Sequence, residues 1–272
     1  MSKFDGVLIC TDLDGTIYKN DKTISAENKQ AIEYFKSEGG LFTFITGRMP
    51  HYSQNAYSLI EPNVPYGCAN GGGLYDGEKG EYIWTLELPK TALELVEFID
   101  EKFASVGIIV STFKNSYFSK ESDASVNYRR VTNLPNLVCN YRDIKEPISK
   151  ILFATESGED IAKIQEALKE HKRYNEFDYI LSERILFEIL PKGASKGLVL
   201  KKLVEHLNVK NLKTVAIGDY DNDVSMLRTA DVGVAVANAS KNALLSADVI
   251  TVSNEEHAIA RIIQDIENGK LF

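Results

Sequence analysis

The stretch ICTDLDGTIY, residues 9–18, places Asp12 and Asp14 two positions apart at the end of an apolar run. Two carboxylates about 4 Å apart repel each other by about 4 kcal/mol at an effective dielectric constant of 20. Asp219 and Asp223, in the segment GDYDND, would increase this repulsion in a shared crevice. A bound cation resolves the conflict. Because the candidate ligands are all hard oxygens, without histidine or cysteine, the sequence favours Mg²⁺ over zinc or copper.

Neutral and basic residues extend this constellation. Thr46 offers a hydroxyl group, Gly47 allows a backbone N–H to approach an anion, and Lys196 follows Ser195, a predicted helix N-cap. A lysine in a first helical turn opposes the helix dipole unless an anion is near. Together with a metal ion, these groups resemble a phosphate cradle. In such a site one ionised aspartate can attack phosphorus, while a second carboxyl group donates a proton to the leaving alcohol and later accepts one from water.

Short β-branched and aromatic runs position these residues. Strands are predicted at 7–11, 41–45, 214–217 and 232–236, and a helix from Ser25 to Glu38 connects the first two. Such alternation predicts a doubly wound, Rossmann-like parallel sheet. Three of these strands end at Asp12, Thr46 and Asp219. We therefore expect these side chains at one crevice, because ligands bind at the carboxyl ends of parallel strands.

The middle of the chain follows a different pattern. The segment YDGEKGEYIW predicts a hairpin. Beyond it, helices are predicted at 91–104 and 159–172 among strands at 82–86, 108–113, 137–141, 151–155, 179–182 and 186–189. The sequence thus predicts an α/β core formed by residues 1–81 and 191–272, with an α+β domain inserted at residues 82–190.

Composition excludes several classes of protein. The 272 residues include 31 Lys and Arg against 39 Asp and Glu, and the net charge of −8 argues against nucleic acid as a partner. No apolar run approaches the length of a membrane span or a signal peptide. Three separated cysteines without a CxxC pair argue against a disulfide framework or a zinc site. We expect a cytoplasmic protein. Its oligomeric state is not readable from the sequence, and a monomer is compatible with it.

Four segments, in order along the chain, resemble the motifs of the haloacid dehalogenase-like hydrolase superfamily: DLDGT at 12–16, TGR at 46–48, SKG at 195–197 and GDYDND at 218–223. The inserted region resembles the type IIB cap of the Cof-type phosphatases, as does FEILPKGASKG at its end. The resemblance covers essentially the whole chain. It implies a phosphatase in which an α+β cap selects the substrate.

The resemblance also implies roles for individual residues. Asp12 would be the nucleophile that forms an aspartyl phosphate, and Asp14 the general acid and base. Mg²⁺ would be held by Asp12, the backbone carbonyl of Asp14, Asp219 and, in support, Asp223. Phosphate would be bound by the backbone N–H of Leu13 and by Thr46, Gly47, Lys196 and Asn222, while Arg48 and Asn70 would border the crevice as substrate contacts. One departure is VANA at 236–239, where relatives often carry glycine before the asparagine, so the resemblance assigns no role to Asn238.

Alternative functions follow from the same residues. A calcium loop counted from Asp219 is rejected, because Val224 and Ala230 stand where glycine and glutamate are required. A phosphomutase would pass the phosphoryl group from the aspartyl phosphate to a sugar instead of water. A non-catalytic receiver would keep it. The leading hypothesis is a Mg²⁺-dependent phosphomonoesterase acting on a small phosphorylated metabolite, such as a sugar phosphate or a phosphorylated cofactor, whose identity the sequence does not reveal.

Overall fold

The computed structural model describes residues 2–272 and divides them into two compact units. The first unit comprises the described residues up to Gly47 together with Ser53–Trp84 and Ser195–Phe272. The second comprises Arg48–Tyr52 and Thr85–Ala194. The two units thus differ from the predicted division at three places: Arg48–Tyr52 and residues 191–194 belong to the second unit, and residues 82–84 belong to the first.

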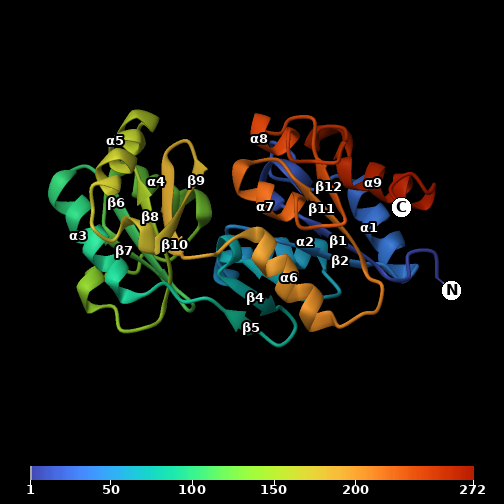
Figure 1. Cartoon of the computed structure of the whole chain (residues 1–272), viewed down its shortest axis with the longest axis horizontal. Helices are drawn as coiled ribbons and strands as arrows, with labels where there is room; N and C mark the ends of the chain where they lie inside the picture. Colours follow the sequence, from blue (N-terminus) through green and yellow to red (C-terminus); the bar gives the residue numbers. More distant parts are fainter. Residues whose placement is uncertain (1) are drawn as a thin grey trace. The chain divides into compact units, whose positions relative to one another are not determined.

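The first unit contains a five-stranded, fully parallel sheet with the strand order β13-β12-β11-β1-β2. Figure 1 labels four of these strands, β12, β11, β1 and β2. Its strands are β1 (Val7–Thr11), β2 (Leu41–Phe44), β11 (Lys213–Gly218), β12 (Val232–Ala235) and β13 (Val249–Ile250). In the middle of the sheet, β1 pairs with β11 on one side and with β2 on the other. The strands predicted to carry the chemistry are therefore direct neighbours.

Helices cover both faces of this sheet. On one face, Ile9 and Phe42 pack with apolar residues of α1 (Ala26–Ser37), α2 (Pro50–Ile60) and α9 (Ala258–Glu267). On the other, Leu8 and Cys10 pack with α6 (Lys196–Leu207), α7 (Val224–Leu227) and α8 (Lys241–Leu244). Burial on both faces explains the almost continuous apolar sequence of the strands. The prediction of a doubly wound core is confirmed.

The first crossover helix shows how local signals set its limits. The Ser25 side chain accepts a hydrogen bond from the backbone N–H of Asn28, which caps the start of α1. Ile32 and Phe35 are buried on its inner face. After the helix, a Cβ at Gly40 would lie 2.4 Å from the Phe35 ring, so the chain can turn back into β2 only with glycine at this position.

A small three-stranded sheet, β3-β4-β5, belongs to the first unit. It is built from β3 (Tyr66–Cys68), β4 (Gly73–Asp76) and β5 (Glu81–Thr85). The hairpin predicted from YDGEKGEYIW is confirmed by β4 and β5. In its turn, the Asp76 side chain accepts hydrogen bonds from the backbone N–H groups of Glu78 and Lys79.

The second unit contains a sheet of its own, which has five antiparallel strands in the order β7-β6-β8-β10-β9. Its strands are β6 (Gly107–Thr112), β7 (Ser116–Lys120), β8 (Ile148–Ala154), β9 (Phe177–Glu183) and β10 (Leu186–Pro191). One face packs on α3 (Leu93–Lys102) and α5 (Gly158–Lys169), and part of the other packs on α4 (Asp123–Thr132). The prediction of an α+β insertion is confirmed.

In the second unit one predicted strand is wrong, and two elements were not predicted. Residues 137–141 form no strand: after the left-handed Asn133 and Pro135, the segment makes one backbone hydrogen bond to β7, from Phe118 N–H to the Leu137 carbonyl. An apolar run becomes a strand only when a partner completes its ladder. Neither β7 nor α4 was predicted, because their many polar residues hide the periodicity of each element. Within residues 2–272, no helix combines the length and apolarity needed to span a membrane.

Candidate active site

Asp12 stands directly after β1 and is fixed through its backbone. Its N–H donates to the carbonyl of Ile217 in β11, at 2.8 Å, and its own carbonyl accepts a hydrogen bond from the Thr11 hydroxyl group. The chain then turns through Leu13–Ile17, where Gly15 has a φ of +81°. A Cβ at Gly15 would lie 2.5 Å from Asp219 Oδ2, so only glycine lets this turn approach the Asp219 carboxylate so closely.

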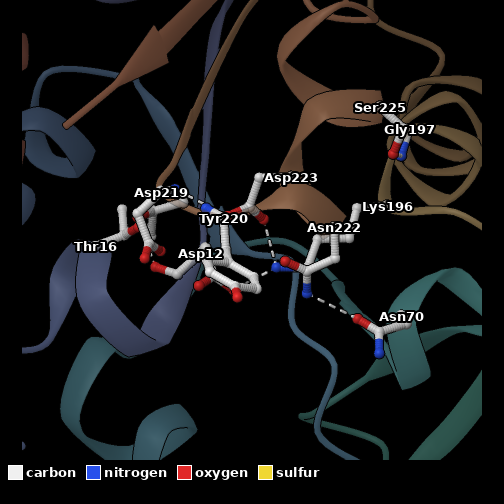
Figure 2. Close-up of polar contacts among 11 residues, drawn as sticks. Asp12, Thr16, Asn70, Lys196, Gly197, Asp219, Tyr220, Asn222, Asp223 and Ser225 are labelled. Atoms are coloured by element: carbon white, nitrogen blue, oxygen red, sulfur yellow. Dashed lines mark hydrogen bonds and ion pairs between the residues drawn. The ribbon is translucent and has the colours of Figure 1, made fainter. Parts of the chain in front are cut away.

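Lys196, in the first turn of α6, joins two of the predicted carboxylates. Its Nζ lies 2.6 Å from Asp12 Oδ1 and 2.5 Å from Asp223 Oδ1, and its side chain is 1% exposed. Figure 2 shows these groups together with Asp219 at the ends of β1 and β11. Residues separated by 184 positions in the sequence thus form one buried charged cluster.

Asp223 and Asp219 are held by further hydrogen bonds. The second carboxylate oxygen of Asp223 accepts from the backbone N–H groups of Asp219 and Tyr220, at 2.9 and 3.0 Å. Asp219 Oδ1 accepts a hydrogen bond from the Thr16 hydroxyl group at 2.8 Å. Both oxygens of Asp223 are therefore engaged within the protein, and the turn after β1 is linked directly to the end of β11.

Burial and mutual repulsion control the ionisation of this cluster. Burial raises the pKa of Asp12, against the opposing charge of Lys196. Burial, followed by the charge of Asp223, raises the pKa of Asp219 to about 6. Burial disfavours the ammonium form of Lys196, but Asp12 and Asp223 together outweigh it and raise its pKa. The single buried ammonium group does not compensate all the carboxylates around it, so the cluster favours an additional cation.

The predicted phosphate-binding residues in the loops after β2 and β11 meet through Asn70. Thr46, which is buried, accepts a hydrogen bond from the backbone N–H of Asn70 at its carbonyl. Asn70 Oδ1 accepts one from Asn222 Nδ2 at 3.1 Å (Figure 2). A Cβ at Gly47 would lie 2.8 Å from that same oxygen. Asn70, expected as a substrate contact, is fully buried and connects Thr46, Gly47 and Asn222.

The loop that carries Asn70 approaches the start of α6. Ala69, Asn70 and Gly71 all have positive φ, and a Cβ at Gly71 would lie 2.0 Å from the carbonyl oxygen of Ser195. Ser195 caps α6 by accepting a hydrogen bond from Leu198 N–H. This close packing positions the helix turn that carries Lys196.

Asp14, unlike Asp12, is accessible. Its side chain is 40% exposed and forms an ion pair with Lys22, 3.0 Å apart. The backbone beside it is held by the loops after β12 and β13: Asn238 Nδ2 donates to the carbonyl of Gly15 at 2.9 Å, and Asn238 Oδ1 accepts from Asn254 N–H at 2.9 Å. The two predicted catalytic aspartates therefore occupy different environments, as the separate roles of nucleophile and general acid and base require.

Comparison with known proteins identifies the family. A family model described as haloacid dehalogenase-like hydrolase matches residues 9–263. The chain belongs to this family. The expected superfamily membership and the prediction of a hydrolase are confirmed.

Relatives and solved structures match almost the whole chain. The 5-amino-6-(5-phospho-D-ribitylamino)uracil phosphatase YitU of Bacillus subtilis (strain 168) is 27% identical over 263 residues, covering 95% of this chain and 96% of the relative. A haloacid dehalogenase-like hydrolase from Bacteroides thetaiotaomicron has a TM-score of 0.84, 24% identity and coverages of 97% and 99%. The subclass IIB sugar phosphatase BT4131 has a TM-score of 0.80, 19% identity and coverages of 97% and 99%. The fold of this chain is thus that of the subclass IIB structure.

Not every predicted site residue joins the cluster of this haloacid dehalogenase-like hydrolase. Arg48 belongs to the second unit, where its guanidinium group lies 4.5 Å from the centre of the Tyr52 ring. Conversely, two contacts were not predicted from the sequence. Thr16, within the DLDGT segment, donates to Asp219, and Asn238, in the VANA segment that differs from the family pattern, donates to the Gly15 carbonyl. The place of each residue in or near a motif could have marked it as a site residue. Its partner could not be predicted, because that partner lies more than 200 residues away in the sequence.

The acidic cluster fits a divalent cation. Among residues 2–272, one group of three potential ligands stands out: Asp12, Asp219 and Asp223 offer carboxylate oxygens that all lie within 4.8 Å of one another. Hard oxygen donors of this kind match Mg²⁺. Because Asp223 already accepts from Lys196 and two backbone N–H groups, Asp12 and Asp219 are better suited to direct coordination, with Asp223 in support.

Proposed function

We propose that this chain is a Mg²⁺-dependent phosphomonoesterase that hydrolyses a small phosphorylated metabolite through an aspartyl phosphate on Asp12. The observation that carries the proposal is the buried contact of Lys196 with Asp12 and Asp223 beside Asp219, at the ends of adjacent parallel strands. The names of relatives such as YitU, a phosphatase, support the same reaction class.

In this mechanism the substrate phosphoryl group occupies the space beside Asp12. Lys196 supplies a positive charge, and the Thr46 hydroxyl, the Asn222 amide and the backbone N–H groups of Leu13 and Gly47 supply donors to its oxygens. Mg²⁺, held by Asp12, Asp219 and the Asp14 carbonyl with support from Asp223, would neutralise charge on the carboxylates and the phosphoryl oxygens. These interactions bind the phosphoryl group and keep Asp12 ionised.

The bond changes are those of two successive transfers. Asp12 forms a bond to phosphorus through a carboxylate oxygen, while the bond from phosphorus to the alcohol oxygen breaks and Asp14 gives that oxygen a proton. Asp14, now ionised, takes a proton from a water molecule that attacks phosphorus and releases inorganic phosphate from Asp12. The exposure of Asp14 allows it to reach both the leaving group and water.

The absence of disulfides agrees with a reducing compartment. Cys10, Cys68 and Cys139 form no disulfide in the structure, and the first two are buried. We infer a cytoplasmic enzyme acting on metabolites of that compartment.

The test is phosphate release from a panel of sugar phosphates, nucleotides and cofactor phosphates, with and without Mg²⁺. The wild type is compared with Asp12→Asn and with Asp5→Asn, a control at an exposed aspartate. We expect phosphate release that depends on Mg²⁺. Its rate should fall by a factor of about 10⁴ or more in Asp12→Asn and stay unchanged in Asp5→Asn. Normal turnover by Asp12→Asn would refute the proposal. An isomeric sugar phosphate as product would indicate a mutase, and a long-lived phosphoenzyme without turnover would indicate a receiver.

A further inference from the structure

The turn that carries Asp14 is irregular, and contacts from outside hold it. Tyr18 N–H donates to the Leu13 carbonyl at 2.9 Å and closes the turn. Between these residues, Asp14 and Gly15 have non-helical backbone angles. Loops open more readily than the strands and helices that they connect, unless further contacts secure them. The position of Asp14 therefore depends on the partners of this turn.

Asn254, in the loop after β13, holds two points of the turn. It is 3% exposed, and its side-chain Nδ2 donates to the Tyr18 carbonyl at 2.9 Å. Its backbone N–H donates to Asn238 Oδ1, also at 2.9 Å, which orients that amide so that its nitrogen donates to the Gly15 carbonyl. One buried residue, 236 positions from Tyr18 in the sequence, thus secures the turn at its middle and at its end.

The next residue, Glu255, holds the segment that follows this turn. Its Oε1 accepts a hydrogen bond from Asn20 N–H at 2.7 Å, and its Oε2 lies 3.4 Å from Lys19 Nζ. Lys19 N–H donates to the Thr23 carbonyl at 2.9 Å, so this segment is itself a tight turn. Asn254 and Glu255 thus hold two successive turns, all within the first unit. We call these two residues the loop clamp.

Lys22, in the second turn, reaches back to Asp14, and its Nζ lies 3.0 Å from Asp14 Oδ1. Lys22 has a φ of +63°, a left-handed conformation that is unfavourable for a residue with a Cβ. Such strain persists only where surrounding contacts impose it. An ion pair whose side chains are 65% and 40% exposed adds little to stability. The second turn therefore matters less for the stability of the protein than for where the Asp14 carboxylate lies.

We propose that the loop clamp positions Asp14 for proton transfer. Asn254 fixes the backbone from which the Asp14 side chain projects, and Glu255 fixes the turn whose Lys22 meets the Asp14 carboxylate. Both residues of the clamp act through other residues, so they are positioning residues and not catalytic ones. This inference rests on the proposed function and makes the general acid and base depend on a loop at the opposite end of the sequence.

The test measures kcat/KM for an alkyl phosphate and for p-nitrophenyl phosphate in the presence of Mg²⁺. An alkoxide leaving group needs a proton from Asp14, whereas nitrophenolate leaves as a stable anion. In the double variant Asn254→Ala, Glu255→Ala we expect the ratio of the first value to the second to fall about tenfold or more. Glu255→Gln keeps an acceptor for Asn20 N–H, so it should recover part of the fall seen in Glu255→Ala.

Two comparisons separate positioning from a general weakening of the protein. In an Asp14→Asn background the double variant should lower the ratio no further, because the group that the loop clamp positions is already gone. Asn28→Ala is the control: Asn28 is fully buried in the same unit, and its Oδ1 accepts a hydrogen bond from Ala260 N–H at 3.0 Å. This control should leave the ratio unchanged. A further fall in the Asp14→Asn background, or an equal fall of both kcat/KM values in the double variant, would overturn the inference.

Hydrogen exchange tests the loop clamp without turnover. In the double variant, exchange of Tyr18 N–H, which closes the Asp14 turn, should become about tenfold faster or more, while exchange of Ile9 N–H in β1 stays unchanged. Unchanged exchange at Tyr18, or equally faster exchange at Ile9, would overturn the inference. If the double variant does not fold, Glu255→Ala, at a side chain that is 40% exposed, carries both measurements. A wild type that hydrolyses neither ester would refute the proposed phosphatase activity, and exchange at Tyr18 would still decide whether the clamp holds the turn.

Discussion

The ammonium group of Lys196 lies 2.6 Å from Asp12 and 2.5 Å from Asp223, and all three side chains are buried. The contact joins the first turn of α6 to the ends of β1 and β11. It places a fixed positive charge beside the proposed nucleophile, and it partly offsets the repulsion between two carboxylates in a region with little water.

Lys196→Met should therefore impair both stability and activity. Without the ammonium group, Asp12 and Asp223 lose their buried counter-charge and must either stay ionised unpaired or take up a proton, so the metal-free protein should lose about 3–5 kcal/mol of unfolding free energy. Added Mg²⁺ should restore part of that loss. The value of kcat/KM for any phosphomonoester should fall about 10²–10³-fold, as on removal of one transition-state donor. Chemical denaturation and steady-state kinetics measure the two effects.

The matched control is Lys202→Met in the same helix. Lys202 pairs with Glu205 on the surface, where ion pairs contribute little. Equal losses in the two lysine variants would contradict the role assigned to Lys196.

Stabilisation by Mg²⁺ should increase with pH. Because folding raises the pKa of Asp219 above its ordinary value, to about 6, the folded metal-free protein holds this proton more tightly than the unfolded chain. The stability contributed by the protonated carboxyl group is present at low pH and is lost as the pH rises from about 4 through 6. Mg²⁺ requires the ionised form, so it binds best where that loss is complete.

Thermal unfolding with and without Mg²⁺, at about pH 5 and about pH 7.5, measures this effect. We expect the rise in Tm caused by Mg²⁺ to be larger at the higher pH, and to be strongly reduced at both in Asp219→Asn. An equal rise at both pH values, or a larger one at low pH, would show that Asp219 does not control metal binding.

Asn238→Ala should selectively slow the reaction of substrates with poor leaving groups. Asn238 holds the carbonyl of Gly15, next to Asp14, so its loss should misplace the proposed general acid. An alkoxide leaving group needs that proton, whereas nitrophenolate is a stable anion and depends on it much less. The ratio of kcat/KM for an alkyl phosphate to that for p-nitrophenyl phosphate should fall about tenfold, and in Asp14→Asn by about 10²-fold or more.

The ratio of kcat/KM values is the decisive measure here, because it excludes the later attack of water on the aspartyl phosphate. Asn242→Ala, which removes a hydrogen bond to Asp221 on a neighbouring loop, is the control and should leave the ratio unchanged. If Asn238→Ala lowered both kcat/KM values equally, Asn238 would be a structural residue and not a positioning residue for Asp14.

Gly71→Ala should be far more destabilising than Gly6→Ala. Both glycines have positive φ, so either substitution costs about 1 kcal/mol in backbone strain. A Cβ at Gly71 would also overlap the Ser195 carbonyl at 2.0 Å, whereas nothing lies within 4 Å of one at Gly6. We expect Gly71→Ala to cost at least about 3 kcal/mol and to weaken phosphate binding through displacement of Lys196. Denaturation midpoints and phosphate titrations compare the two variants. Similar midpoints would contradict the packing of Gly71 against α6.

Local sequence patterns predict the core strands and several of the candidate site residues. The apolar runs at 7–11 and 41–45 are followed directly by a polar residue, and the run at 214–217 is followed by Gly218 and then Asp219; parallel strands bring such ends together. That rule is enough to predict Asp12, Thr46 and Asp219 at one edge from the sequence alone. It holds because strands buried on both faces must be apolar, so a charged residue marks the point at which a strand leaves the core.

Contacts between distant segments were decided only by the tertiary structure. No local pattern pairs Asn238 with Gly15, places Asn70 between Gly47 and Asn222, or brings His51 to Ser116. Residues 137–141 have strand composition without a strand, because pairing depends on a partner elsewhere in the chain. The sequence by itself determined which residues could perform chemistry and which strands present them. The packing of loops and helices determined which side chains hold those residues in place, since each such contact depends on the path of the whole chain.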